Sequence, residues 1–135
     1  MARCLGLRRS EICALTWDNI KSISVTIDKA NILNDEMKLV KKAPKSFDGA
    51  RTLEMPQILI TYMDSFSKDK NTIVTIKPNS ITYRLGSLVK SLGIRCRFQD
   101  LWHYNVYVIL ALGVPDKYLK KRLGHATPNM LKTVF

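Results

Sequence analysis

The chain has 135 residues, of which 46% are hydrophobic and 24% are charged. These proportions indicate one globular domain with its own core, and they exclude a disordered chain. The charge balance is unusual, since 22 Lys and Arg residues face 11 Asp and Glu residues, for a formal net charge of +11. Such an excess favours a polyanionic partner, nucleic acid before a membrane surface, over a basic surface that binds nothing.

Cysteines, histidines and apolar runs exclude several other classes of protein. The three cysteines, Cys4, Cys13 and Cys96, are scattered without CxxC spacing and the chain has only two histidines, so we expect neither a disulfide framework nor a metal site. The longest apolar run, Val106 to Val114, is too short for a bilayer, which needs about 20 residues. With no signal peptide before the first patterned segment, we expect a soluble, cytoplasmic protein without cofactor, membrane or small-molecule substrate.

The first part of the chain predicts a helical start and a small antiparallel sheet. Leu5, Ile12 and Leu15 recur at helical spacing, and a turn follows at 17–19. Alternating and β-branched residues then predict strands, separated by turn-forming composition. The expected strands are 22–27, one within 32–42, and 50–55, with a hairpin loop at 44–49 between the last two.

From Pro56 onward the hydrophobic pattern has helical periodicity. Prolines, capping residues and glycines mark where helices start and stop. The expected helices begin at Pro56, Asn79–Ser80, Asp100, Pro115 and Thr127–Pro128. The fold class predicted from this order of elements is α+β, mostly helical with a small three-stranded antiparallel sheet.

Positive charges gather at loops and helix ends, where a fold can reach phosphates and displace their counterions. An exposed, solvated face explains any single cluster of this kind. Their number along the chain instead favours nucleic acid as the partner. The candidate DNA-contacting residues are Arg9, Lys42, Arg51, Arg97 and Lys121.

Four segments, in this order, carry a family resemblance. They are Gly6 to Trp17 (GLRRSEICALTW), Pro44-Lys45-Ser46 with Arg51-Thr52, Phe98 to His103 (FQDLWH), and Leu123 to Pro128 (LGHATP). They resemble the G-L-R-x-S-E, P-K-T…R-T, F-H-D-L-R-H and L-G-H-x-[ST] motifs of the tyrosine recombinases, the phage integrase family.

The resemblance implies a catalytic domain over residues 1–135 that cuts and rejoins double-stranded DNA through a covalent phosphotyrosine. Arg8 matches the first catalytic arginine, whose guanidinium forks onto oxygens of the scissile phosphate. Lys45 matches the hairpin lysine that protonates the departing 5′ oxygen. His125 matches the histidine that hydrogen-bonds the phosphate or the nucleophile.

Each of these residues also has a purely structural interpretation. Arg8 can pair with Glu11 three positions further along a helix. Lys45 can be an ordinary loop lysine, and His125 can be a histidine favoured by a helix C-terminus. Their occurrence together in the family order favours the functional interpretation.

Three family positions are substituted. Gln99 stands where the family has histidine, and its amide still offers a hydrogen-bond donor. Trp102 stands where the family has its second arginine, and a neutral indole cannot form a bidentate clamp on a phosphate. Phe135 stands at the nucleophile position, ten residues after His125, and lacks the hydroxyl that would attack phosphorus. The sequence therefore predicts impaired DNA cleavage.

The resemblance also implies an amino-terminal core-binding domain and a tail beyond the nucleophile, and the printed sequence contains neither. We expect an incomplete catalytic domain: a fragment, an engineered piece, or the product of a decayed mobile element of bacterial or phage origin. Expected partners are duplex DNA and either copies of itself or subunits of a full-length recombinase. The alternative function is a DNA-binding module without catalysis, or a relic without a role on DNA.

Overall fold

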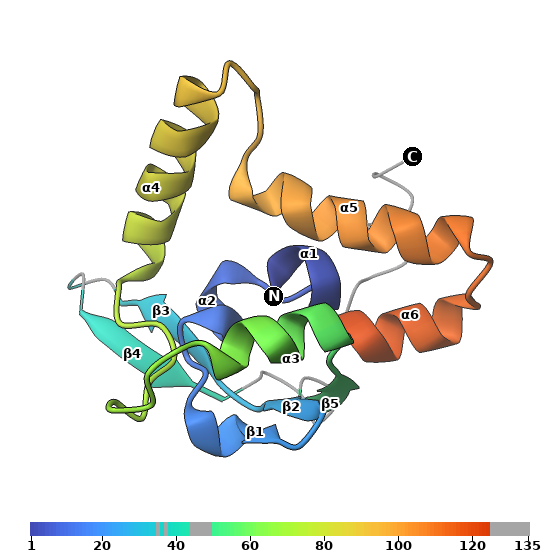
Figure 1. Cartoon of the computed structure of the whole chain (residues 1–135). Helices are drawn as coiled ribbons and strands as arrows, with labels where there is room; N and C mark the ends of the chain where they lie inside the picture. Colours follow the sequence, from blue (N-terminus) through green and yellow to red (C-terminus); the bar gives the residue numbers. More distant parts are fainter. Residues whose placement is uncertain (35, 37, 44–49, 125–135) are drawn as a thin grey trace.

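The computed structural model describes residues 1–34, 36, 38–43 and 50–124. Its elements follow the chain in two groups, a helix-and-strand half and a helical half (Figure 1). The first half contains α1 (Ala2–Leu5), α2 (Arg9–Ile12), the 3-10 helix η1 (Trp17–Asn19), β1 (Ile20–Lys21), β2 (Ser24–Ile27), β3 (Ala30–Leu33), β4 (Leu39–Lys42) and β5 (Arg51–Glu54). The second half contains α3 (Gln57–Asp64), α4 (Pro78–Ser91), α5 (Phe98–Ala111) and α6 (Asp116–Leu123).

The predicted α+β class with a three-stranded antiparallel sheet is confirmed, but the strands are grouped differently. The three-stranded sheet has the order β1-β2-β5, and β3 and β4 form a separate two-stranded sheet. The strand expected within 32–42 therefore does not join the main sheet, whose third member is the short β1. The predicted loop at 44–49 and the helix predicted from Thr127 lie outside the described residues.

The amino-terminal helical segment is broken in two, where a single helical stretch was predicted. Gly6 ends α1 with a φ of +66°, a left-handed conformation that costs glycine little. Arg8 then has extended backbone and serves as the N-cap of α2 rather than lying inside a helix. Because of this break, Arg8 lies at the N-terminal end of α2 and not in the middle of a longer helix.

Among the described residues, two hydrophobic clusters form the core. The larger one joins α1, α2, the main sheet and α3, with Leu5, Leu7, Val25 and Ile27 almost completely buried. The smaller one lies between α5 and α6 and consists of Trp102, Val106, Leu119 and Leu123. Helix α1 packs against α5 (Figure 1), so residues from the two ends of the described chain meet.

Helix α4 stands away from the rest of the molecule (Figure 1). Only Pro78 of its residues is buried, and Tyr83 is 79% exposed. The chain returns from α4 to α5, which begins at Phe98 with Arg97 as its N-cap. The expectation that Asp100 caps this helix is corrected: Asp100 lies in the first turn, where its carboxylate accepts the Arg97 backbone N–H at 2.7 Å.

No helix in the described part of the chain is long and apolar enough to cross a membrane.

Candidate functional site

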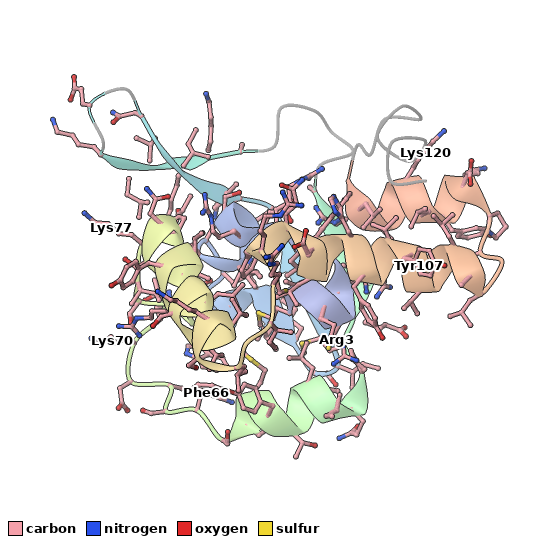
Figure 2. The ribbon with its side chains drawn as sticks, turned by 90° about the horizontal axis from the view of Figure 1, so that it is seen from above. Arg3, Phe66, Lys70, Lys77, Tyr107 and Lys120 are labelled. Atoms are coloured by element: carbon pink, nitrogen blue, oxygen red, sulfur yellow. The ribbon has the colours of Figure 1, made fainter. Side chains whose placement is uncertain are left out.

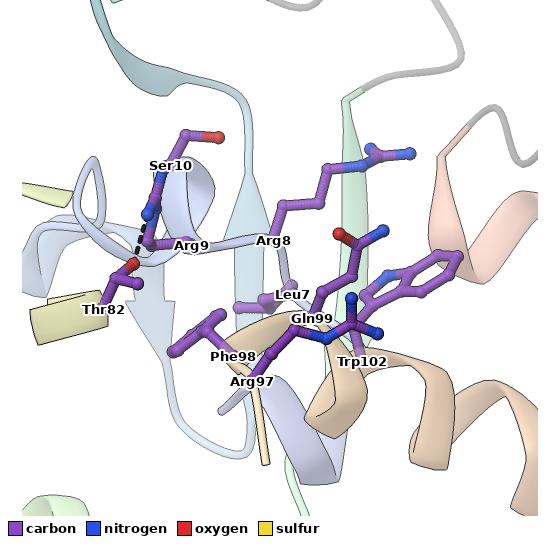
Figure 3. A pocket seen from close by; sticks show the side chains of 9 residues that line it. All are labelled: Leu7, Arg8, Arg9, Ser10, Thr82, Arg97, Phe98, Gln99 and Trp102. Carbon is purple, nitrogen blue, oxygen red and sulfur yellow. Dashed lines mark hydrogen bonds between the residues drawn. The ribbon is translucent and has the colours of Figure 1, made fainter. Parts of the chain in front are cut away.

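A pocket of about 480 Å³ opens where α2, α4 and the start of α5 meet (Figure 3). Its walls combine three guanidinium groups with hydroxyls, an amide and apolar side chains. The lining residues are Leu7, Arg8, Arg9, Ser10, Thr82, Arg97, Phe98, Gln99 and Trp102. Two of the four recombinase-like segments, around Arg8 and around Gln99, therefore meet in one cationic hollow.

Arg8 links the pocket to two other parts of the chain, Glu11 and Gly124. Its Nη2 donates to the carbonyl oxygen of Gly124 at 3.1 Å, so the fourth such segment also reaches the site. Its Nη1 lies 3.3 Å from Glu11 Oε1, and its side chain is 40% exposed. The predicted Arg8–Glu11 ion pair is therefore present, and it leaves Arg8 accessible from the pocket side.

Arg51 lies behind this pair. Its side chain is only 4% exposed, and its Nη1 and Nη2 donate to Glu11 Oε1 and Oε2 at 3.0 and 2.9 Å. This parallel arrangement is the strong, bidentate form of an arginine–carboxylate contact. The expectation that Arg51 contacts DNA does not fit this placement, because a guanidinium buried against a carboxylate presents no surface to a phosphate.

Gln99 and Trp102 occupy the same pocket, one turn apart on α5 (Figure 3). Gln99 is exposed, whereas Trp102 is 5% exposed and packs into the cluster between α5 and α6. Its ring also meets His103 edge-on, with centroids 5.4 Å apart. Within the described residues, Trp102 Nε1 is buried without a hydrogen-bond partner. Trp102, which the sequence places at the position of the family's second arginine, is therefore part of the core.

Two further arginines line the pocket, each with a partner. Arg9 Nη1 donates to the hydroxyl of Thr82 on α4, on the opposite side of the pocket from Trp102 (Figure 3). Arg97 Nη2 lies 3.0 Å from Asp100 Oδ1, and its side chain is 83% exposed. The hydrogen bond from the Arg97 side chain lowers the pKa of Asp100 and raises that of Arg97 itself.

The remaining predicted DNA contacts lie away from the pocket; Figure 2 shows how widely the charged side chains spread over the molecule. Lys42 is exposed at the end of β4, and Lys121 is exposed on α6. On the same helix, Arg122 is half-buried and donates from Nη2 to the carbonyl of Cys4 at 3.3 Å. Burial, and secondly the charge of Arg51, lower the pKa of Arg122. Lys45, His125 and Phe135 lie outside the described residues, and their roles stay predictions.

Two residues of the site were given no functional role by the sequence: Glu11 was expected only as a structural partner of Arg8, and Thr82 was not singled out at all. Glu11 stands within the first recombinase-like segment, so the motif contained the signal. Nothing in the sequence singled out Thr82, because it lines the pocket only through the position of α4 relative to α2. No group of three or more potential metal ligands occurs among the described residues.

Comparison with solved structures identifies the fold. The chain resembles a Tn1549 transposon integrase in complex with circular intermediate DNA, with a TM-score of 0.83 and 16% sequence identity over 99% of this chain and 51% of that one. It also resembles the XerA recombinase (TM-score 0.70, 19% identity, 98% of this chain and 47% of that one). A lambda integrase dimer bound to a COC′ core site gives a TM-score of 0.63 at 13% identity, over 98% of this chain and 39% of that one.

The fold is therefore that of the tyrosine recombinase catalytic domain, as the four segments predicted. The chain spans about half the length of the Tn1549 integrase and XerA structures, and less of the lambda integrase. No protein-family model and no curated protein matches the sequence.

Proposed function

We propose that this chain is the catalytic domain of an integrase-type tyrosine recombinase, acting in DNA integration and site-specific recombination. In the form printed here, it binds duplex DNA and is impaired in cleavage. The domain covers residues 1–135, and it belongs to a bacterial or phage-borne mobile element that acts in the cytoplasm at the nucleoid. The proposal unites the fold, the net charge of +11 and the cationic pocket.

One observation carries the proposal: Arg8, Gln99 and Trp102 line one pocket although about 90 positions or more separate the first from the others. These are three of the positions that the family uses to hold a scissile phosphate. Arg8 offers a partly exposed guanidinium there, and Gln99 adds an exposed amide. A phosphate in this pocket would be held chiefly by Arg8, because its contact to Glu11 is long, at 3.3 Å, and that carboxylate is already held by Arg51 at 2.9 Å.

The substitutions support impaired cleavage. Catalysis of phosphoryl transfer rests on fixed donors aimed at charge that develops in the transition state, and losing one costs about 3 kcal/mol, or about a hundredfold in rate. Trp102 supplies no such charge. Phe135 removes the hydroxyl needed for a covalent intermediate.

The partners follow from what the similar structures contain. The Tn1549 integrase is in complex with DNA, and the lambda integrase is a dimer on its core site. For this chain we propose duplex DNA as the ligand, with copies of itself or subunits of a full-length recombinase beside it. Neither a cofactor nor a metal is part of the proposal.

A salt series with a labelled duplex tests DNA binding by fluorescence anisotropy. We expect a dissociation constant of about 10⁻⁴ to 10⁻⁶ M at physiological salt, and a linear fall of log affinity with log salt. Arg8→Gln should reduce the slope by about one, because one phosphate contact is lost. Lys70→Met is the matched control, since it removes one exposed positive charge outside the pocket.

The alternative, a relic without a role on DNA, predicts a flat salt response or no binding even at low salt. Either result would contradict the proposal. A DNA-binding module that only competes with an intact recombinase would bind in the same way, and it would differ by remaining inactive after the catalytic positions are restored.

A further inference from the structure

We propose that Arg51 is a positioning residue that occupies the carboxylate of Glu11 and so leaves the positive charge of Arg8 available to a phosphate. The inference rests on the proposed function, because it takes a DNA phosphate as the ligand of Arg8. It gives Arg51 an indirect role, in place of the direct DNA contact that the sequence suggested.

The distances show how the carboxylate is shared. Glu11 Oε1 and Oε2 accept hydrogen bonds from Arg51 at 3.0 and 2.9 Å. The backbone N–H of Arg8 also donates to Oε2, at 2.7 Å. The guanidinium of Arg8 makes a single, longer contact of 3.3 Å to Oε1. The two oxygens are thus filled mainly by Arg51 and by the backbone, and the side chain of Arg8 is their weakest partner.

The three charged side chains, Arg8, Arg51 and Glu11, also differ in exposure to solvent, and Arg8 again stands apart from the other two. The side chains of Arg51 and Glu11 are 4% and 9% exposed, whereas that of Arg8 is 40% exposed. Two arginines and one carboxylate leave one positive charge in excess. Since the buried pair is bidentate and neutralises itself, the excess charge lies on the guanidinium that faces the pocket.

The fold fixes Arg51 in this place from two sides. Arg51 is the first residue of β5 and is paired with Ile27 of β2. It lies on the same face of the strand as Leu53 and Met55, which are both buried. Gly124 closes the other side, because a β-carbon there would lie 2.8 Å from Arg51 Nη1. The carbonyl of the same Gly124 accepts from Arg8 Nη2 at 3.1 Å, so both guanidiniums are held against one backbone residue.

Removal of Arg51 would change the electrostatics of the pocket. A buried carboxylate without a partner is costly, so Glu11 would recruit the nearest cation. Among the described residues, that cation is Arg8, three positions earlier in the chain and already in contact with Oε1. Arg8 would then pair with Glu11 instead of a phosphate.

The experiment compares duplex binding of the wild-type chain, Arg8→Gln, Arg51→Met, Glu11→Gln and the double variant Arg51→Met with Glu11→Gln. The probe is a fluorescently labelled duplex, followed by anisotropy over a salt series. Circular dichroism confirms that each variant is folded before binding is measured. Lys70→Met again controls for the general effect of losing one positive charge.

We expect Arg51→Met to lose about as much as Arg8→Gln, about one unit of salt slope and about fivefold in affinity near physiological salt. The double variant should regain the wild-type slope, because no carboxylate remains to compete for Arg8. Recovery when a second residue is changed distinguishes positioning from direct contact, since a lost phosphate contact cannot be restored by neutralising Glu11.

Two results would overturn the inference: an Arg51→Met slope equal to that of Lys70→Met, or a double variant that stays one unit below wild type. A third would come from adding Arg8→Gln to the double variant, if that triple variant kept the slope of the double variant. If Arg51→Met does not fold, the double variant still decides, because it leaves no unpaired buried charge. Absence of duplex binding by the wild-type chain would instead contradict the proposed function, so the two failures are distinguishable.

Discussion

Gly6 lies so close to Asn105 that a β-carbon on Gly6 would be 2.7 Å from Asn105 Oδ1. The same β-carbon would meet Leu123 Cδ2 at 2.9 Å. Asn105 is itself fixed, since its Nδ2 donates to the carbonyl of Arg3 at 2.8 Å. The absence of a side chain at Gly6 is therefore what allows α1, α5 and α6 to approach one another.

Replacing Gly6 should be costly for this reason. Gly6→Ala combines a left-handed backbone, which costs a non-glycine residue about 1–2 kcal/mol, with overpacking of about 1–3 kcal/mol. We expect the free energy of unfolding in urea to fall by about 2–5 kcal/mol. Gly86→Ala is the matched control, because Gly86 lies inside α4 and a β-carbon added there would meet nothing within 4 Å. This control change should stabilise the protein by about 0.5–1 kcal/mol.

Trp102→Arg should destabilise the protein although it restores a family residue. The indole is 5% exposed among Val106, Leu119 and Leu123, so its replacement by a guanidinium leaves a cavity and buries a charge. We expect a loss of about 3–5 kcal/mol in urea unfolding, against a smaller loss for Trp102→Phe. Equal stability of Trp102→Arg and wild type would mean that the cluster between α5 and α6 does not depend on Trp102.

A suicide substrate, nicked near the scissile phosphate, tests the predicted impairment. The printed chain should give no covalent protein–DNA adduct on a denaturing gel. Phe135→Tyr alone should give little, because Trp102 still lacks the guanidinium. Combining it with Trp102→Arg and Gln99→His should recover more than any single change, since such residues act as a unit.

Two controls keep that experiment decisive. Circular dichroism must show that the triple variant is folded, given the cost expected for Trp102→Arg. The triple variant with Arg8→Gln should again form no adduct, which would tie any recovered activity to the pocket. An adduct formed by the printed chain itself would contradict the predicted impairment of cleavage.

The first turn of α5 should show a pH-dependent stability. Hydrogen bonds from Arg97 lower the pKa of Asp100 below its ordinary value of 3.8. A carboxyl with a lowered folded-state pKa stabilises above its ordinary pKa, and this contribution disappears as the pH falls through the lowered value. Asp100→Asn should therefore destabilise the protein slightly near neutral pH, as exposed ion pairs do, and this cost should shrink as the pH falls below the ordinary Asp pKa. Urea unfolding at neutral pH and below that pKa measures the difference, and an undiminished cost at low pH would contradict it.

The types of the secondary-structure elements were predictable from the sequence, because they depend on local hydrophobic periodicity and on the prolines and glycines at which elements begin and end. The helices after Pro56 follow this rule, and α3, α4, α5 and α6 all appear where hydrophobic spacing predicted them. The break at Gly6 was not predicted, because helical spacing on both sides concealed it. Gly6 is itself a local signal for a helix end, but the close approach of Asn105, which leaves no room for a β-carbon at this position, is contained in no local pattern.

The candidate site was predictable only in part. The motifs indicated that Arg8 and Gln99 would converge, and the pocket contains both. The expectation for Arg51 does not fit the structure, since positive charge near a loop does not by itself imply exposure. Arg51, Leu53 and Met55 are two positions apart and so lie on the same face of the strand. Because Leu53 and Met55 are apolar and buried, strand periodicity would have predicted that Arg51 is buried too. Which carboxylate receives it depends on the position of α2, and that requires the tertiary structure.

The contacts that hold the amino-terminal residues also bear on how the chain folds. Asn105 to Arg3, Arg8 to Gly124 and Arg122 to Cys4 join positions 102, 116 and 118 apart in sequence. Closing loops of that length costs entropy before any contact compensates it, and such contacts slow folding. During synthesis, these three contacts can form only after α5 and α6 have left the ribosome, whereas the cluster that buries Leu5 and Leu7 consists mainly of residues from the main sheet and α3, which are made earlier.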